Sequence, residues 1–288
     1  MNKKVWFITG ASKGLGLSLA QRLLKEGYRV AATSRNISDL EKEIGATNEQ
    51  FLPLSMNLLD EGDVAKAVQK TTGHFGTIDV LVNNAGYGLV GALEELSDAE
   101  SRKNFDVNVF GTLNVIRQVM PQMRKQKSGH VFNLSSIGGF NGVFPGFGIY
   151  CASKFAVEGL SESLTEEVKP FGIKVTIVSP GYFRTSFLSS SSLSVPANPI
   201  NDYARVREVQ SMHENQIDGN QPGDPDKAAG VLIAVAEQEE PLLHLFLGQD
   251  AYQLAEAKIE LVKKDMEQIR SLATATDFAP GVPETLSE

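Results

Sequence analysis

The stretch Thr9-Gly10-Ala11-Ser12-Lys13-Gly14-Leu15-Gly16 decides the fold of this chain. It follows the apolar run Val5 to Thr9, and from Leu15 to Leu24 apolar residues recur at helical spacing. Glycine permits a tight turn and a close backbone approach, and the start of a helix offers free N–H groups to a phosphate. A strand, a glycine-rich turn and a helix in this order predict a site for a dinucleotide pyrophosphate.

The rest of the chain alternates between apolar runs and helical patterns. We predict strands over residues 5–9, 28–33, 51–56, 78–82, 130–135, 174–179 and 243–247. We predict helices over residues 15–24, 39–44, 61–71, 99–123, 152–168, 225–236 and 251–272. Continuously apolar strands separated by helices are typical of a parallel sheet covered on both faces. The chain is therefore predicted to have an α/β fold, a doubly wound parallel sheet of the Rossmann-like kind.

This pattern predicts a single nucleotide-binding and catalytic domain over residues 1–273. Inside it, residues 186–223 hold a run of serines, several prolines and no strand pattern, so we expect them to cover the substrate as a lid. Tyr203, Val206, Val209 and Met212 recur every three residues, which predicts a short helix within the lid. Residues 274–288 are predicted to be a flexible tail.

Composition narrows the class of protein. The chain has 288 residues, 42% of them hydrophobic, and its 27 Lys and Arg against 35 Asp and Glu give a net charge of −8. An acidic chain is a poor partner for nucleic acid or an anionic membrane. The single cysteine, Cys151, cannot form an internal disulfide, and no apolar run is long enough for a signal peptide or a membrane span. We expect a cytoplasmic protein that binds neither nucleic acid nor membrane.

Five further motifs follow the glycine turn, each at the end of a predicted strand or on a predicted helix. They are Asn83-Asn84-Ala85-Gly86, Asn108 in Asn-Val-Phe-Gly-Thr, Ser136, Tyr150-Cys-Ala-Ser-Lys154 and Pro180-Gly181. Together with the glycine spacing G-x-x-x-G-x-G, they resemble the short-chain dehydrogenase/reductase family over about residues 4–185. The resemblance implies a Rossmann-like enzyme that uses a nicotinamide nucleotide.

Tyr150 and Lys154 lie four residues apart, which places both on one face of a helix. A phenol has a pKa near 10, and an adjacent ammonium favours its ionised form. The resemblance implies that Tyr150 is the acid and base, that Lys154 lowers its pKa and binds the nicotinamide ribose, and that Asn108 holds a water in a proton relay. It also implies a serine that binds the substrate carbonyl. Ser136 is favoured over Ser135 because its separation from Tyr150 along the sequence is nearer to the usual spacing of the family.

The resemblance further implies which residues hold the nucleotide. They are Gly10, Ser12, Lys13, Gly14, Leu15, Gly16, Ser34, Arg35, Asn57, Leu58, Asn84, Ala85, Gly86, Tyr150, Lys154, Pro180, Gly181 and Thr185. The second strand ends in Ser34-Arg35, without the carboxylate that usually holds the ribose hydroxyls of NAD. Arg35 and Lys13 can instead bind a 2′-phosphate, so we predict NADP(H) rather than NAD(H). The histidines lack metal-ligand spacing, and no metal is expected.

We therefore predict an NADP(H)-dependent oxidoreductase, a ketoreductase that interconverts an alcohol and a ketone or aldehyde by hydride transfer. Two alternatives stay open, a non-catalytic nucleotide-sensing protein on the same fold and a sugar-nucleotide epimerase or dehydratase. An apolar small-molecule substrate is expected from side chains that flank the motifs, namely Phe144, Phe147, Phe183, Phe187 and Leu188. The resemblance also implies a homodimer or homotetramer. The sequence leaves the physiological substrate, the reaction direction and the stereochemistry open.

Overall fold

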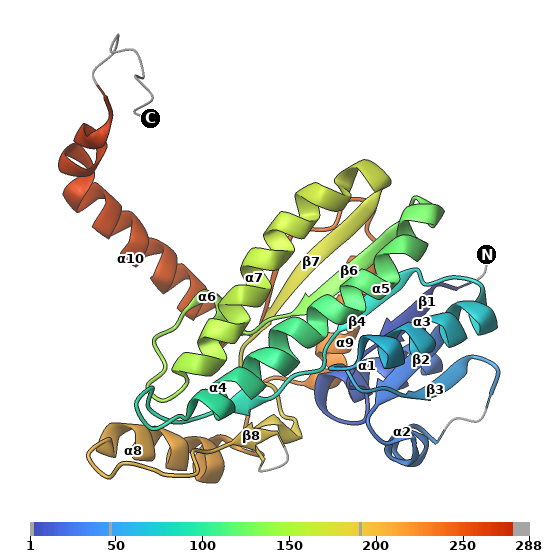
Figure 1. Cartoon of the computed structure of the whole chain (residues 1–288), viewed down its shortest axis with the longest axis horizontal. Helices are drawn as coiled ribbons and strands as arrows, with labels where there is room; N and C mark the ends of the chain where they lie inside the picture. The colour runs from blue at the N-terminus through green and yellow to red at the C-terminus, as the bar shows by residue number, and fades with distance from the viewer. Residues whose placement is uncertain (1–2, 46–47, 190–191, 279–288) are drawn as a thin grey trace.

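The computed structural model describes residues 3–45, 48–189 and 192–278. Within them, seven parallel strands form one sheet in the order β3-β2-β1-β4-β6-β7-β9 (Figure 1). The strands are β1 (Val5–Ile8), β2 (Arg29–Ser34), β3 (Phe51–Ser55), β4 (Val80–Asn83), β6 (Gly129–Leu134), β7 (Ile173–Pro180) and β9 (His244–Leu247). The strand order reverses between β1 and β4, and ligands bind at such a switch point beyond the carboxyl ends of the strands.

Helices cover both faces of the sheet because the inner strands carry buried apolar residues on both faces. On β1, Trp6 and Ile8 belong to the core under one layer of helices, whereas Phe7 belongs to the core under the other. The first layer is α1 (Gly14–Lys25), α2 (Ile37–Ile44) and α9 (Pro225–Ala236). The second layer is α3 (Glu61–Phe75), α5 (Gly111–Gln126) and α7 (Gly148–Val168). The predicted doubly wound α/β fold is confirmed.

The segment predicted as a long helix over residues 99–123 is helical along its whole length, but it is not a regular α-helix throughout. The segment forms α4 (Asp98–Phe105), one π-helical stretch η1 (Asp106–Phe110) and then α5. A π-helical turn shifts the side chains that follow it, and such turns are frequent at functional sites. Here the turn holds Asn108, whose side chain is buried and hydrogen-bonded to neighbouring segments rather than to its own helix alone.

The predicted lid contains more regular structure than its composition indicated. It includes η3 (Ser186–Leu188), β8 (Leu193–Ser194), α8 (Ala204–Met212) and η4 (His213–Ile217). The short helix predicted from its apolar spacing is confirmed as α8. The pairing of β8 with β5 (Gly88–Leu89) in a small parallel sheet was not predicted. Residues 190–191 of the lid lie outside the described residues.

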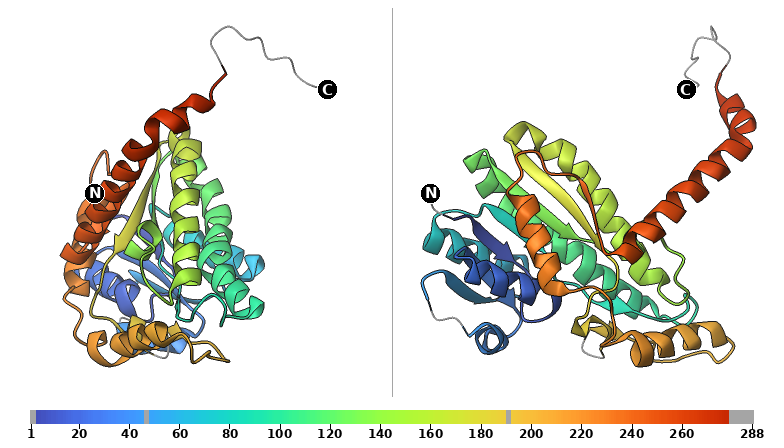
Figure 2. Two further views of the ribbon diagram at one scale, coloured as in Figure 1. Left: turned by 90° about the vertical axis from the view of Figure 1, so that its left-hand side faces the viewer. Right: turned by 180° about the vertical axis from the view of Figure 1, so that it is seen from behind.

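The last elements of the described part of the chain are the long helix α10 (Gln249–Ala273) and a short turn, η5 (Thr274–Thr276). The beginning of α10 is fixed to the body, where Asp250 accepts a hydrogen bond from the backbone of Tyr182 at 2.7 Å. The rest of α10 extends away from the body (Figure 2). In the predicted tail, residues 279–288 lie outside the described residues. Among the helices described, none is long and apolar enough to span a membrane.

Candidate active site

The glycine turn and the segment after β4 are locked together at the carboxyl end of the sheet. Gly10 has φ +63°, and a Cβ there would lie 2.8 Å from the Cα of Ala85. A Cβ on Gly16 would overlap the amide of Asn84. That amide donates to the carbonyl oxygens of Thr9 and Gly10, at 2.9 and 2.8 Å. These glycines therefore let two motif segments meet at the sheet centre.

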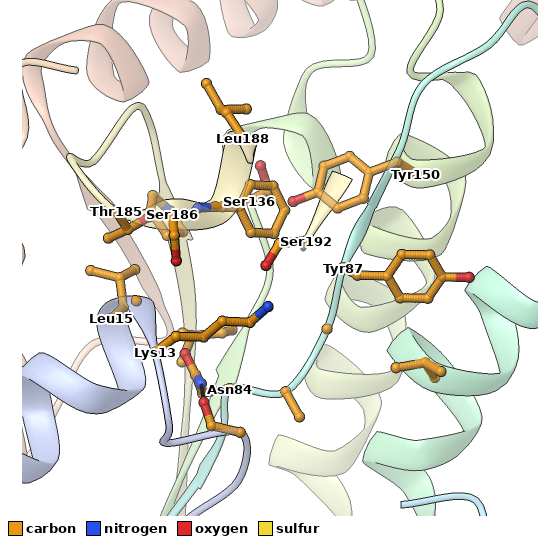
Figure 3. Close-up of a pocket in the computed structure, with 18 of the residues that line it drawn as sticks. Lys13, Leu15, Asn84, Tyr87, Ser136, Tyr150, Thr185, Ser186, Leu188 and Ser192 are labelled. Atoms are coloured by element: carbon orange, nitrogen blue, oxygen red, sulfur yellow. Dashed lines mark hydrogen bonds between the residues drawn. The ribbon is translucent and has the colours of Figure 1, made fainter. Parts of the chain in front are cut away.

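A cavity of about 1100 Å³ runs from the glycine turn to the lid (Figure 3). Every residue predicted to hold the nucleotide lines it, with the exception of Gly16, and Ser136 lines it as well. Asn108 and Gly16 stand behind its wall. Figure 3 shows Tyr150 and Tyr87 on one side of the pocket and Thr185 and Ser186 on the other.

Tyr150 lies in the first turn of α7 and is almost fully buried. Its ring packs against Phe187 and Phe147, at centroid distances of 5.9 and 6.3 Å. Burial raises the pKa of the Tyr150 phenol, and a hydrogen bond with Ser136 acts in the opposite direction. In the protein without bound ligands, the Tyr150 phenol therefore keeps its proton at neutral pH, as a proton donor must.

The two candidate serines occupy different environments. Ser136 caps the helix α6 (Ile137–Phe140), and its hydroxyl accepts from the backbone N–H of Gly138 at 3.0 Å while it is hydrogen-bonded to Tyr150. Ser135 instead donates to the backbone carbonyl of Lys154 at 3.3 Å and holds α7 against the sheet. Of the two, Ser136 is the residue that the structure places beside the Tyr150 hydroxyl.

Lys154 is buried one turn after Tyr150. Its ammonium donates to the carbonyl oxygen of Leu134 at 2.7 Å. Burial lowers the pKa of Lys154 to about 8, although the nearby charge of Glu158 raises it. Glu158 is itself buried, accepts a hydrogen bond from the Ser179 hydroxyl at 2.8 Å, and has its pKa raised by burial. Sequence reasoning missed Glu158, although its place four residues after Lys154 was a usable signal.

Asn108 connects α7 to the segment that follows β4. Its amide donates to the Ser153 hydroxyl at 3.0 Å and to the carbonyl of Tyr87 at 3.1 Å, and its oxygen accepts from the N–H of Tyr87 at 3.0 Å. A Cβ on Gly86 would lie 3.0 Å from that oxygen and 3.5 Å from the Lys154 ammonium. Asn108 therefore fixes the backbone beside Lys154, and its role in holding a water stays a prediction.

The far end of the cavity carries cations beside the end of β2. The hydroxyl of Ser34 donates to that of Ser12 at 3.2 Å, so the glycine turn and the end of β2 are in contact. Lys13 and Arg35 both line the cavity here. Burial lowers the pKa of Lys13, and the charge of Arg35 lowers it further. Asp39 and Glu43, both of α2, are the acids among the described lining residues.

The cavity also fits a nucleotide by its open hydrogen-bonding groups. Gly14 has φ +61°, and a Cβ on it would have Thr185 as its nearest neighbour, at 3.8 Å. Gln221 is 1% exposed and lines the cavity, yet its side-chain oxygen has no hydrogen-bond partner within the described part of the chain. This acceptor is open to a donor from a molecule bound in the cavity or from a water.

The lid end of the cavity is mainly apolar. All the side chains predicted to form the substrate pocket line it, namely Phe144, Phe147, Phe183, Phe187 and Leu188. Sequence reasoning missed the pair Tyr182 and His213, whose side chains are hydrogen-bonded at 2.8 Å across the lid. Burial lowers the pKa of His213, so this polar pair is uncharged at neutral pH.

Comparisons with known proteins agree with this geometry. Residues 4–194 match the family model described as short chain dehydrogenase. Oxidoreductase BOA17 of Botryotinia fuckeliana is 36% identical over 95% of this chain and 99% of its own length. The 3-ketodihydrosphingosine reductase of Bacteroides thetaiotaomicron is 39% identical over 77% of this chain and 80% of its own.

A solved structure is similar over nearly the whole fold. A short-chain dehydrogenase from Streptomyces avermitilis superposes with a TM-score of 0.87 and 36% identity, over 95% of this chain and all of the other. The predicted resemblance is therefore confirmed over more than half of the chain. This chain belongs to the short-chain dehydrogenase family of oxidoreductases.

Proposed function

We propose that this protein is an NADP(H)-dependent ketoreductase that interconverts an apolar ketone or aldehyde and its alcohol. One observation carries the proposal. Tyr150, Ser136 and Lys154 meet at the wall of a single cavity whose far end is bordered by Lys13 and Arg35. A protein that only senses nucleotides has no need of a buried tyrosine and lysine at this point.

The reaction follows from the protonation states of these side chains. A bound nicotinamide nucleotide would supply or accept the hydride. In the reducing direction, Ser136 donates a hydrogen bond to the substrate carbonyl oxygen and Tyr150 transfers its proton to that oxygen. The ammonium of Lys154 stabilises the phenolate that remains. In the oxidising direction the phenolate takes the proton back.

The end of β2 supports the choice of NADP(H). The nucleotide would lie along the glycine turn, with its 2′-phosphate near Lys13 and Arg35. A charge-assisted hydrogen bond contributes about 1.5–3 kcal/mol, and a tenfold change in affinity corresponds to about 1.4 kcal/mol. One such contact is enough for a tenfold preference. Ser34 also supports a preference for NADP(H). It occupies the position at the end of β2 where a carboxylate would repel the 2′-phosphate, and a serine is neutral.

The lid end supports the substrate class. Four phenylalanines and Leu188 border it, and the polar pair Tyr182 and His213 is uncharged. Anionic or sugar substrates would lose hydration there without a charged partner. The similarity to a 3-ketodihydrosphingosine reductase supports a bulky, lipid-like ketone.

The test is an activity screen of the purified protein. It is mixed with NADPH and a panel of long-chain, aromatic and steroid ketones beside sugar and anionic carbonyls, and absorbance of the reduced nicotinamide is followed. We expect oxidation of NADPH with the apolar ketones. Turnover of sugar or anionic carbonyls alone would overturn the substrate class. Binding of NADPH without turnover of any carbonyl would favour the nucleotide-sensing alternative.

A further inference from the structure

The last helix leaves the body of the protein after its second turn. Ala251 and Ala255 are buried and belong to a small core that includes Ile137 of α6. From Ile259 to Ala273 every residue of α10 is exposed. Figures 1 and 2 show this part of the helix projecting from the body.

The projecting part carries a regular stripe of exposed apolar side chains. Ile259 and Val262 are each 40% exposed, Met266 is 56% exposed and Ile269 is 50% exposed. They follow one another at intervals of three, four and three residues, and Ala255 continues the pattern four residues earlier. Alternating intervals of three and four are the signature of a helix that packs along its length against another helix. We call these four residues the α10 stripe.

The projecting part of α10 needs another structure to pack against its apolar face. Isolated helices of about 12–15 residues are only marginally stable in water, and most helices in proteins are held by packing of their apolar face. Contiguous exposed apolar side chains rimmed by charges mark interaction surfaces. Charges do rim the α10 stripe, with Glu256, Lys263 and Arg270 along one edge and Lys258 and Asp265 along the other.

We propose that the α10 stripe packs against the same stripe of a second copy of this chain, with the two helices antiparallel. Ile259 then lies opposite the partner's Ile269, and Val262 lies opposite the partner's Met266. This register pairs the exposed segment with itself and leaves the two bodies at opposite ends of the helix pair.

The body of the protein decides the orientation. It covers Ala251 and Ala255 on the same face of α10 that bears the stripe. In a parallel pair the two bodies would lie at the same end, between the helices, and would hold them apart. In the antiparallel pair each body meets only the end of the partner helix.

At the two ends of the antiparallel helix pair, the charges on the edge that holds Glu256 and Arg270 are complementary. Glu256 faces the partner's Arg270, and by symmetry Arg270 faces the partner's Glu256. Lys263 and Asp265 each meet their own copy near the centre. Both remain at the solvent edge, where water and salt weaken repulsion between like charges.

The charge of α10 favours a second copy over a membrane surface. Helices that lie on anionic membranes are rich in Lys and Arg on their polar face. The sequence of α10 has five acidic and four basic residues, and the whole chain carries −8. Such a helix has no electrostatic attraction to an anionic bilayer.

A pair of matched variants tests the surface. Val262→Glu with Met266→Glu places two charges in the stripe, whereas Ala257→Glu with Ser271→Glu places the same charges on the opposite face of α10. We expect the first variant to lose far-UV helical signal and the contact between α10 helices, while the second keeps both. Equal behaviour of the two variants, by circular dichroism and light scattering, would overturn the proposal.

Cysteine cross-linking tests the partner and the orientation together, because the native Cys151 is buried. Val262→Cys and Met266→Cys proteins are prepared separately, then oxidised mildly alone and mixed. We expect a disulfide-linked dimer mainly in the mixture. Cross-linking of each variant alone would show a parallel pair, and no cross-linking would exclude this contact. Flotation of the native protein with phosphatidylcholine and phosphatidylserine vesicles, abolished by Val262→Glu with Met266→Glu, would identify a membrane as the occupant instead.

Discussion

The ammonium of Lys154 lies 6.0 Å from the centre of the Tyr150 ring and donates its hydrogen bond to the carbonyl oxygen of Leu134. Lys154 thus acts on the phenol through its charge, from a position fixed by the backbone of β6. Because both side chains are buried, this charge is weakly screened by solvent. The arrangement favours the phenolate once a proton has left Tyr150.

Removal of the Tyr150 hydroxyl tests its role as the acid and base. We expect Tyr150→Phe to fold normally, because the ring keeps its packing against Phe187 and Phe147. Turnover should fall by roughly 10²–10⁴-fold, the usual contribution of a positioned acid or base. Tyr87→Phe is the matched control, since Tyr87 lines the same cavity, and it should keep turnover within a few fold. Near-native turnover of Tyr150→Phe would refute the assignment.

Replacement of Lys154 should separate stability from activity. Burial lowers the pKa of Lys154 to about 8, below the value near 10.4 of an unfolded lysine. Below pH 8 both states are charged, and burial of the charge costs about 3 kcal/mol. Lys154→Met should therefore be inactive yet more stable than the native protein at pH 7.

The stability gain of Lys154→Met should depend on pH in a definite direction. As pH rises from about 8 toward about 10.4, the native folded state loses the buried proton before the unfolded state does, so native stability increases. The difference in free energy of unfolding between the variant and the native protein should then decrease, until only the effect of changed packing remains. Urea unfolding at several pH values measures it. The stability advantage of the variant over the native protein should be larger at pH 7 than at pH 10. The opposite order would contradict the account.

Glu158 should set the alkaline limit of activity through Lys154. Its charge raises the pKa of Lys154 from one helical turn away. Glu158→Gln removes that charge, so Lys154 should lose its proton at a lower pH and the alkaline limb of the kcat profile should move to lower pH. Glu162→Gln, on an exposed side chain one turn further along α7, is the control and should leave the profile unchanged. Identical profiles for Glu158→Gln and the native protein would show that Glu158 only stabilises the fold.

The end of β2 should control which nucleotide is used. Ser34→Asp combined with Arg35→Ala removes an attraction for the 2′-phosphate and adds a repulsion, so the ratio of kcat/KM for NADPH to that for NADH should fall. Arg35→Ala alone should lower the ratio less, because Lys13 remains. A double variant with the native ratio would place the phosphate elsewhere.

Much of this fold could be predicted because the apolar pattern of a buried parallel strand is short and continuous. The runs that became β1, β4 and β7 are bounded by glycine, asparagine or proline, and their ends gather the motifs at one edge of the sheet. Helix α9 was predicted with its observed bounds because Pro225 marks its first residue, and the structure adds Asp224 as its N-cap.

Other features depend on contacts that a linear pattern does not contain. The π-helical turn at Asn108 depends on hydrogen bonds to Ser153 and Tyr87, which come from other elements. The pair Tyr182 and His213 is joined only when the lid folds over the cavity. In α10 the sequence indicates an amphipathic helix, but not that its apolar face lies outside the body.

The most direct test of the central claim compares the two nicotinamide nucleotides on one substrate. The measurement is kcat/KM of the native protein for NADPH and for NADH, with a single apolar ketone held at saturation. Two cations beside Ser34 predict a preference for NADPH of at least about tenfold, since one charge-assisted contact contributes that much. Equal values, or a preference for NADH, would contradict the account of this site.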